Sequence, residues 1–356
     1  MPTPYAHTSP DEPVGPRGGW HTDRAMATTS RPRAWVRWSH RLTLLLLLGC
    51  LLAITPMYLA GGRTSLGVVV AAAVPAILLG ALAAALVSIR HRTWLRLVLL
   101  LALLSTQWPL ADYAVADPGA DRASTPTSPQ LRVAALNTLW GGPDLDELAA
   151  LAADHDVLAL QEMPPVLVEP LTERLGDGWQ LAARDHDDYI DADAAVWVRD
   201  TWQVADAQPV PDASPAATAL TLTRDDATVR LVGTRLQNPA FGAADRWGEG
   251  LDALAATAST SPDPVVILGD LNAPPSAVAF RRFLDDAGLA DCPAQLGSGF
   301  PGTWGLGRGP DVAPVPIDHV LVGGPAGTRA RCTAFAPRAV EGTDHRAVTA
   351  TVTVPR

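Results

Sequence analysis

Residues 265–272 read Val-Val-Ile-Leu-Gly-Asp-Leu-Asn, an apolar run that is followed at once by a carboxylate and an amide. A short apolar run of this kind, bounded by glycine, is typical of a buried strand. Two more polar blocks follow along the chain, Ile317-Asp318-His319-Val320 and Thr343-Asp344-His345-Arg346. Carboxylates at the ends of neighbouring strands can converge on one point, where they suit a divalent cation and a phosphate. The blocks therefore predict a site for metal-assisted phosphoester chemistry.

Two upstream segments complete the set. Residues 131–137 (Leu-Arg-Val-Ala-Ala-Leu-Asn) and 156–162 (Asp-Val-Leu-Ala-Leu-Gln-Glu) each read as a short apolar strand that ends in polar residues. An unpaired charge at the end of a buried strand is costly. A divalent cation bound to Glu162 would satisfy that charge, and a solvated strand end is the alternative interpretation.

These five blocks, in this order and spacing, resemble the endonuclease/exonuclease/phosphatase superfamily, to which DNase I belongs, over Leu131–Val354. The resemblance implies an α+β fold, a four-layer α/β/β/α sandwich in which helices flank two packed sheets. It also implies a hydrolase of phosphoester bonds that uses Mg²⁺, with Mn²⁺ as the alternative ion. Periodicity alone predicts only a mixture of helices and strands.

The resemblance assigns roles to the polar residues of these blocks. Glu162 is the main metal ligand, and Asn137 and Asp344 complete the metal site. Asp270 orients or deprotonates the attacking water, and Asn272 holds the phosphate. Alternation along a strand would place the last two side chains on the same face. Without the preceding apolar run, an Asp-Leu-Asn sequence would more often be a turn.

A histidine and a carboxylate complete the implied machinery. A histidine near the scissile phosphate can exchange protons near neutral pH, and by resemblance His345 has this role. Asp318 orients its ring, as carboxylates do in other catalytic pairs. The other histidines of the catalytic region with no such support, His155, His186 and His319, are interpreted as structural or surface residues.

One block departs from the family pattern. Many members have His or Tyr where Arg235 stands, and arginine cannot act as a general base because it stays protonated. It can bind phosphate through two nitrogens and stabilise transition-state charge, and a surface ion pair is the alternative. Asn238 matches an asparagine that contacts phosphate in part of the family. Trp304 is expected beside the site.

The first third of the chain predicts a membrane anchor. Three apolar runs, Leu42–Ala60, Leu66–Ile89 and Leu95–Ala114, are each near the ~20 residues that a spanning helix needs. Arginines precede the first run and separate the last two, whereas only Arg63 lies in the other loop, so the positive-inside rule places the N-terminus in the cytoplasm and the catalytic domain outside. The expected organisation is a disordered segment (1–40), three transmembrane helices (41–115), a flexible linker that lets the domain reorient (116–130) and a catalytic domain (131–356).

Three smaller patterns carry expectations of their own. Ala72, Ala76, Gly80 and Ala84 recur at four-residue spacing, which permits close helix packing or reflects the alanine-rich composition. Ser276 is expected to cap a helix that runs through Asp286. Cys292 and Cys332 are expected to form a disulfide, since an exported domain lies where disulfides persist, and two separate buried thiols are the alternative.

Charge restricts the substrate. Residues 1–130 hold 11 Arg and 6 acids, and residues 131–356 hold 16 Arg and 31 acids, which gives net charges of +5 and −15. DNA binding needs basic groups, so nucleic acid is not the expected partner. The sequence predicts an extracytoplasmic phosphoesterase that acts on an envelope lipid or another phosphorylated small molecule, and resembles membrane-anchored bacterial members of the superfamily. An anchored nuclease and a catalytically silent ligand-binding domain are the alternatives, and the oligomeric state is not indicated.

Overall fold

The computed structural model describes residues 31–88, 94–117, 128–187, 192–213, 215–305 and 312–356. Most of the segment predicted to be disordered, residues 1–30, lies outside this range. The remaining residues 31–40 begin helix α1, so the structure places a helix where the composition predicted disorder.

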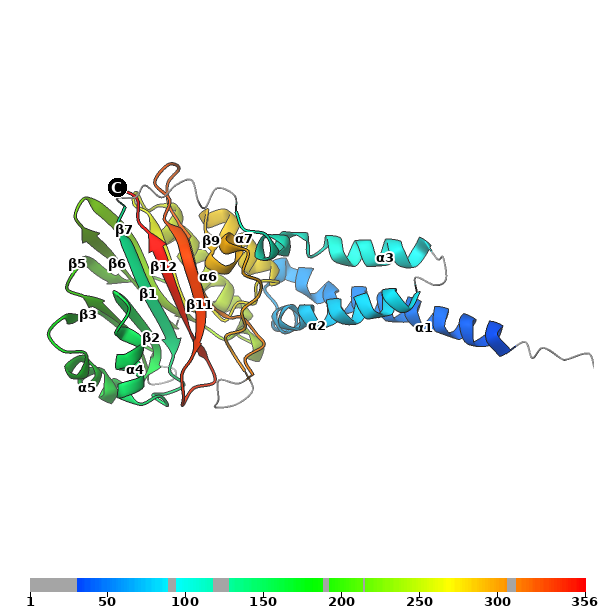
Figure 1. The fold of residues 1–356 in the computed structure, drawn as a ribbon, viewed down its shortest axis with the longest axis horizontal. Helices are drawn as coiled ribbons and strands as arrows, with labels where there is room; N and C mark the ends of the chain where they lie inside the picture. The colour runs from blue at the N-terminus through cyan, green and yellow to red at the C-terminus, as the bar shows by residue number, and fades with distance from the viewer. Residues whose placement is uncertain (1–30, 89–93, 118–127, 188–191, 214, 306–311) are drawn as a thin grey trace, which may run out of the picture. The chain divides into compact units, whose positions relative to one another are not determined.

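Two six-stranded sheets form the centre of the catalytic domain (Figure 1). The first sheet has the order β11-β12-β1-β2-β4-β3 and the second β5-β6-β7-β8-β10-β9. The strands of the first sheet are β1 (Gln130–Asn137), β2 (Val157–Met163), β3 (Trp179–Asp187), β4 (Ala192–Arg199), β11 (Arg331–Ala339) and β12 (Arg346–Thr353). Those of the second are β5 (Gln203–Pro209), β6 (Pro215–Arg224), β7 (Ala227–Leu236), β8 (Val265–Asp270), β9 (Ala290–Asp291) and β10 (Asp318–Gly323).

Helices cover the outer faces of both sheets. Helices α4 (Leu145–Ala152) and α5 (Pro165–Leu175) pack on the first sheet through an apolar cluster that includes Leu148, Val168 and Trp197. Helices α6 (Ala244–Ser259) and α7 (Val278–Ala287) pack on the second through Trp247 and Phe280. A third cluster, with Val133, Val266 and Val320, fills the space between the sheets. The result is the predicted α/β/β/α sandwich, in which the central strands are apolar because both of their faces are buried.

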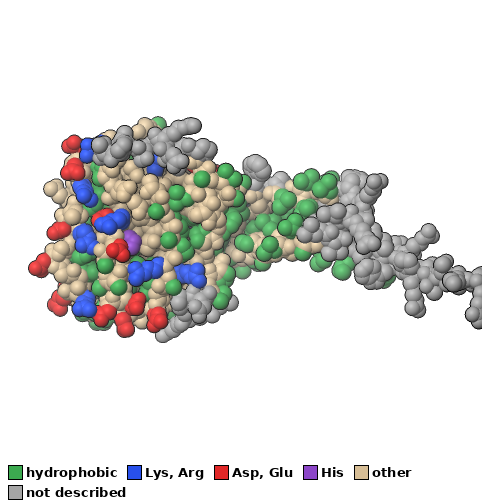
Figure 2. Space-filling view, in the orientation of Figure 1, with side chains coloured by type: hydrophobic (Ala, Val, Ile, Leu, Met, Phe, Trp, Pro, Cys, Tyr) green, Lys and Arg blue, Asp and Glu red, His purple; other side chains and the backbone are tan. Residues whose placement is uncertain are grey.

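The helices that precede this domain differ from the three predicted spans. They are α1 (Arg31–Ile54) with the 3₁₀ segment η1 (Thr55–Gly62), α2 (Ser65–Ser88), and α3 (Trp94–Ser105) with the 3₁₀ segment η3 (Trp108–Ala114). Among the residues that the structure describes, two stretches are long and apolar enough to cross a membrane, Arg41–Gly62 and Ser65–Ala83. The third run divides into α3, with 12 residues, and η3, which begins at Trp108; Pro109 in the first turn of η3 has no N–H to continue the α-helical hydrogen bonding. Figure 2 shows charged side chains on the catalytic domain and none among the described residues of the helices on the face in view.

Several contacts join these helices to the catalytic domain. Arg63 forms a two-pronged ion pair with Asp252, at 2.7 and 2.5 Å. The Ser276 hydroxyl donates to the carbonyl of Ala71 at 2.5 Å, so it does not cap α7 as predicted. The Tyr113 hydroxyl, in η3, donates to Asp291 at 2.7 Å.

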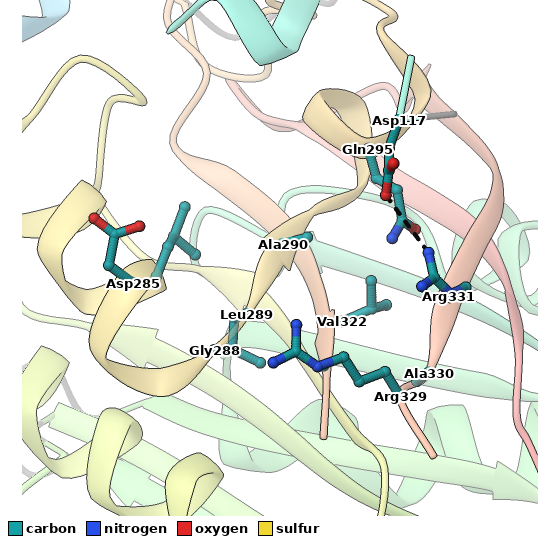
Figure 3. Close-up of a pocket in the computed structure, with 12 residues that line it drawn as sticks. Asp117, Asp285, Gly288, Leu289, Ala290, Gln295, Val322, Arg329, Ala330 and Arg331 are labelled. Atoms are coloured by element: carbon teal, nitrogen blue, oxygen red, sulfur yellow. Dashed lines mark ion pairs between the residues drawn. The ribbon is translucent and has the colours of Figure 1, made fainter. Parts of the chain in front are cut away.

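Asp117, near the start of the predicted linker, is also held in place. The Asp117 backbone N–H donates to the carbonyl of Gln295 at 3.0 Å, and its carboxylate pairs with Arg331 at 3.5 Å beside a cavity of about 360 Å³ (Figure 3). Residues 118–127 lie outside the described range. Free reorientation of the catalytic domain, which the linker composition predicted, does not fit these contacts.

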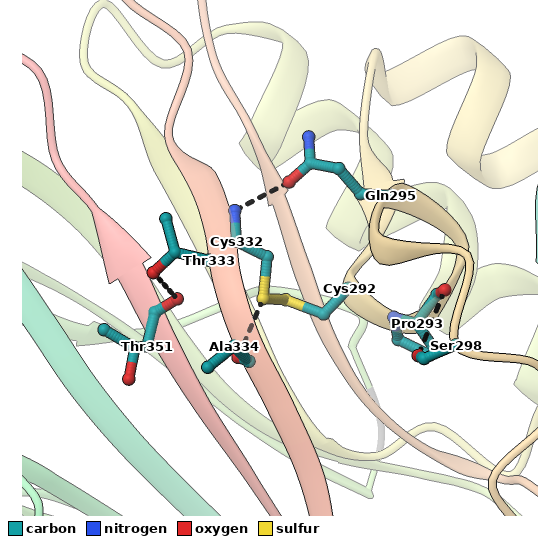
Figure 4. The surroundings of a disulfide bond; sticks show 8 residues. All are labelled: Cys292, Pro293, Gln295, Ser298, Cys332, Thr333, Ala334 and Thr351. Carbon is teal, nitrogen blue, oxygen red and sulfur yellow. Dashed lines mark hydrogen bonds between the residues drawn. A yellow bond between two sulfur atoms is a disulfide. The ribbon is translucent and has the colours of Figure 1, made fainter. Parts of the chain in front are cut away.

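The predicted disulfide is present between Cys292, at the start of α8 (Cys292–Leu296), and Cys332 in β11 (Figure 4). Both cysteines are buried. Next to the disulfide, Gln295 accepts a hydrogen bond from the backbone N–H of Cys332 at 2.6 Å. The short helix is thereby fixed to an edge strand of the first sheet.

Candidate active site

The register of the sheets brings the predicted residues to one edge. Strands β1 and β2 are parallel and pair Asn137 with Gln161, next to Glu162. Strands β7 and β8 are also parallel and pair Arg235 with Asp270, which in turn pairs with Asp318 across the antiparallel β8–β10 ladder. Because the carboxyl ends of parallel strands meet at the same edge, both sheets contribute polar side chains to one place.

Asn137 links the two sheets inside the site. Its side-chain nitrogen donates to Oε1 of Glu162 at 2.9 Å and to Oδ2 of Asp270 at 3.0 Å. Its backbone carbonyl accepts from the hydroxyl of Thr343 at 2.8 Å, which ties the Thr343-Asp344-His345 block to the same point. Asn137 is only 2% exposed. One amide therefore fixes the separation of the two carboxylates.

Arg235 lies in the site, so the alternative of a surface ion pair is wrong. Its Nε donates to Oε1 of Glu162 at 2.9 Å, and both side chains are buried. The positive charge of Arg235 therefore balances the carboxylate that was expected to depend on a cation, as buried charges require a partner. Asn238 is partly buried nearby and lines the same cavity. Its side-chain oxygen accepts from the Ala240 N–H, which leaves substrate contact to its nitrogen.

The structure brings the predicted histidine and its carboxylate together. Nδ1 of His345 lies 2.9 and 3.1 Å from the two carboxylate oxygens of Asp318. The Thr303 hydroxyl accepts from the backbone N–H of Asp318 at 3.1 Å, and this holds the carboxylate in place. Burial alone would lower the pKa of His345, but the charge and hydrogen bond of Asp318, with smaller contributions from Asp270 and Asp344, raise it to about 9. The ring is therefore an imidazolium at neutral pH.

Asn272 reaches the site by a different route from the one predicted. Strand β8 ends at Asp270, and Asn272 has a left-handed backbone with φ of +48°, so strand alternation does not place it. Its backbone N–H donates to Oδ1 of Asp270 at 2.9 Å, and its side-chain nitrogen donates to the carbonyl of Leu236 at 2.9 Å and to Oδ2 of Asp270 at 3.3 Å. Through these hydrogen bonds, Asn272 holds the carboxylate of Asp270 in position.

Asp270 is a buried carboxyl in an acidic neighbourhood. Burial, followed by the charge of Asp318, raises its pKa, while His345, Arg235 and the Asn137 hydrogen bond act in the opposite direction. A carboxylate with a raised pKa is a stronger proton acceptor. This direction is consistent with the predicted role of Asp270 as the group that takes a proton from water.

Local backbone conformation at the site is unusual. Gly269 has φ of +136°, and a Cβ at that position would lie 2.0 Å from the carbonyl oxygen of Thr234. Only glycine fits there, which explains the Gly-Asp-Leu-Asn sequence. Glu162 sits at a bulge of β2 with φ of +53°. Non-glycine residues in this region are strained, and such strain gathers at functional sites.

The donor set suits a hard divalent cation. One oxygen of Asp270, one of Asp318 and a ring nitrogen of His345 all lie within 4.8 Å of one another, and the two carboxylate oxygens are the ligands that fit, because a protonated ring has no free nitrogen. Oδ1 of Asp344 is buried without a hydrogen-bond partner, which a bound cation would supply. The predicted ligands Asn137, Glu162 and Asp344 border the same cavity, so carboxylate and amide oxygens of the kind that Mg²⁺ prefers surround it.

A cavity of about 440 Å³ connects these residues, which is within the range of ligand sites. Trp304 lines it as predicted and donates from Nε1 to Oδ2 of Asp344 at 3.0 Å. Sequence reasoning missed one wall of the cavity, which consists of Val68, Val69 and Ala72 of helix α2. The only sequence signal was the row of small residues that begins at Ala72.

The other histidines have structural partners. His319 is buried and bonds to Asp291 through Nδ1 and to the carbonyl of Ala273 through Nε2, both at 2.8 Å. His186 bonds to Asp193, and His155 to the carbonyl of Leu151. These contacts fit their interpretation as structural or surface residues.

Comparisons with known proteins agree with this architecture. A model of the family described as "Endonuclease/Exonuclease/phosphatase family" matches residues 134–345. The structure of D. rerio TDP2 complexed with single-strand DNA product has a TM-score of 0.54 and 17% identity, covering 63% of this chain and 99% of that one. The mannosyl-6-phosphatase of Bacteroides thetaiotaomicron has a TM-score of 0.48 and 15% identity, with coverages of 63% and 99%. No curated protein matches the sequence. The likeness to TDP2 shows a shared fold.

Proposed function

Because the chain belongs to the endonuclease/exonuclease/phosphatase family, we propose that it is a membrane-anchored, extracytoplasmic, metal-dependent phosphoesterase that hydrolyses a phosphate, pyrophosphate or phosphodiester of an envelope lipid. The observation that carries the proposal is the buried site itself. It combines a proton acceptor, a protonated histidine and a permanent positive charge in one cavity, formed by Asp270, His345 and Arg235.

The residues of this site account for an in-line attack by water on phosphorus. Asp270 accepts a proton from the attacking water as the new P–O bond forms. His345, held through Nδ1 by Asp318, donates its proton from Nε2 to the leaving oxygen as the ester bond breaks. Arg235 adds positive charge as charge develops on the phosphoryl oxygens. A divalent cation, when bound by the surrounding carboxylates, supplies further stabilisation of that charge.

The contacts of the apolar helices support the proposed topology. The α1–α2 connection contacts the domain through Arg63, and η3, which follows α3, contacts it through Tyr113. These contacts are the support for proposing that both connections lie on the same side of a membrane as the catalytic domain. In the proposed topology α1 and α2 each cross the membrane, the segment from α3 to η3 would cross it a third time, and the domain lies outside the cell, as the arginine distribution predicted.

A lipid substrate is favoured over nucleic acid by charge and by location. Residues 131–356 have a net charge of −15, which repels a polyanion. The cavity also lies beside α2, one of the two helices apolar enough to cross a membrane. A small phosphorylated lipid head group does not require an extended basic surface. An anchored nuclease remains the second candidate, and the same experiment separates the two.

The test uses the full chain in lipid nanodiscs with Mg²⁺. Turnover of a prenyl pyrophosphate and of plasmid DNA is measured side by side, with His345→Ala as the control for contaminating activity. We expect lipid hydrolysis that is lost in the variant, and no cleavage of DNA. Cleavage of DNA that the variant abolishes, without lipid turnover, would replace this proposal with the nuclease.

A further inference from the structure

The catalytic cavity has an apolar wall that belongs to the membrane-anchor region. Val68, Val69 and Ala72 of α2 line the same cavity as the polar residues of the site. The cavity also has apolar lining from other elements: Leu139, Pro239, Ala240, Pro274, Val315 and Ile317. One part of the cavity is therefore chemically suited to hydrocarbon, whereas a phosphoryl group needs only the polar part.

Helix α2 is fixed at this wall. The Ser65 hydroxyl accepts a hydrogen bond from the backbone N–H of Gly242 at 3.1 Å, and the carbonyl of Ala71 accepts one from Ser276 at 2.5 Å. Val68 is 5% exposed, so it is packed against the domain. These contacts lie on both sides of Val69 in the sequence and set which face of the helix meets the cavity.

The face of α2 that reaches the cavity continues along the helix as a row of small side chains. Residues four apart lie on one face of a helix, and Ala72, Ala76 and Gly80 follow this spacing. Ala76 and Gly80 are exposed, and no heavy atom lies within 4 Å of a Cβ built on Gly80. The buried residues Ala71 and Val74 belong to the apolar cluster on another face. An uncovered track thus leads from the cavity along α2.

We propose that the cavity is a two-part substrate site that selects a phosphate or pyrophosphate ester of a long hydrocarbon chain. The polar part takes the phosphoryl group, and Val69 and Ala72 contact the first carbons of the chain, which continues over Ala76 and Gly80. The exposed row continues along α2 beyond the cavity, which favours a long chain over a short one. The assignment rests on the proposed phosphoesterase function and names its substrate class and two specificity-determining residues.

The test measures binding, so that it does not depend on turnover. Two non-hydrolysable phosphonates with the same head group, one with a long prenyl chain and one with a short alkyl chain, are titrated against the full chain in nanodiscs. The variants are Val69→Trp, which fills the apolar part, and Val69→Ser, which removes apolar surface without blocking the cavity. Leu66→Trp is the matched control, because Leu66 is 61% exposed on the same helix and does not line the cavity.

Each buried methylene is worth roughly a fourfold change in affinity. We expect Val69→Trp to weaken binding of the long-chain phosphonate about tenfold and Val69→Ser about threefold, with the short-chain probe within about twofold in Val69→Ser. Leu66→Trp should change neither. Long-chain binding that is unaffected in both Val69 variants, or an equal loss for both probes in Val69→Ser, would overturn the proposal.

Turnover of a long-chain prenyl phosphate ester by the unmodified protein distinguishes failure of the phosphoesterase function from failure of the chain-binding site. If that ester is not hydrolysed but the phosphonates show the expected pattern, the phosphoesterase function fails and the chain-binding site stands. If the ester is hydrolysed and the Val69 variants bind both probes normally, the phosphoesterase stands and the role of α2 is wrong.

Discussion

At the scale of single residues, the site is a set of buried polar groups that hold one another in place. Asn137 fixes Glu162 and Asp270, Arg235 balances Glu162, and Asp318 fixes His345. Each of these bonds crosses between different strands or loops. Removal of one partner therefore leaves a buried polar neighbour without its hydrogen bond or counter-charge. The change can be measured as a shift in pKa or in the free energy of unfolding.

The first prediction concerns the protonation of His345. In metal-free protein, the ring should titrate with a pKa of about 9, because Asp318 stabilises the imidazolium. Since this pKa lies above the ordinary value of 6.5, the pair stabilises the fold fully below pH 6.5 and loses its effect as the pH rises through about 9. Histidine-selective NMR should show the pKa falling towards its ordinary value in Asp318→Asn. An unchanged titration would show that Asp318 does not hold the proton.

The second prediction concerns the buried ion pair. Arg235→Ala leaves the carboxylate of Glu162 without its charged partner, which should cost about 3 kcal/mol in the free energy of unfolding. Adding Glu162→Gln should restore most of that loss, because the neutral amide needs no counter-charge. Chemical denaturation of both variants measures the difference. Equal stability of the single and double variants would contradict the pairing.

The third prediction concerns Gly269. Gly269→Ala should prevent accumulation of folded protein, because its Cβ would collide with the carbonyl of Thr234. Gly178→Ala is the control, since a Cβ there has no heavy atom within 4 Å and no positive φ applies. Size-exclusion chromatography of the two purified proteins distinguishes the outcomes. A well-folded Gly269→Ala protein would show that the backbone at this turn can relax.

At the scale of elements, the sequence predicted the central strands better than the edges. Strands β1, β2 and β8 appear where the apolar runs predicted them. Strands β3 and β11 were not predicted, and they form the two edges of the first sheet. An edge strand has one neighbour and tolerates polar residues and Pro337, so its hydrophobic pattern is weak.

The residues of the site, like the central strands, could be predicted from the sequence. These residues follow apolar runs that are contiguous in sequence, so the motifs are visible along the chain. Strand alternation was the wrong basis for predicting the direction of the Asn272 side chain. The left-handed backbone that Asn272 adopts is not apparent in the sequence. The α2 wall was missed because Val69 and Asn137 are brought together only by the docking of α2 on the domain.

The disulfide gives a prediction at this scale. The Cys292–Cys332 bond joins α8 to β11 across 40 residues of sequence, so its loss should lower the free energy of unfolding by about 2–4 kcal/mol. Dithiothreitol should lower the melting temperature of the unmodified protein and leave the Cys292→Ala, Cys332→Ala double variant unchanged. A reductant effect of equal size in both proteins would show that the disulfide is not its cause.

At the scale of the whole molecule, the apolar helices and the hydrolase domain act as one unit in this account. Arg63 and Asp252 are 189 residues apart in sequence, and Ala71 and Ser276 are 205 apart. No local pattern indicates such contacts, which is why composition alone predicted a tethered domain. The consequence is that residues of α2 line the cavity of the site, which is where the proposed lipid substrate would enter.

The most direct measurement of the central claim is phosphate release from a long-chain prenyl phosphate or pyrophosphate by the full chain in nanodiscs. It is made with Mg²⁺, after EDTA treatment, and with Asp270→Asn in place of the unmodified protein. We predict release that needs the metal and falls at least about a hundredfold in the variant, since proton transfer contributes on this order. Release that survives EDTA or the loss of the Asp270 carboxylate would contradict the assignment of this site.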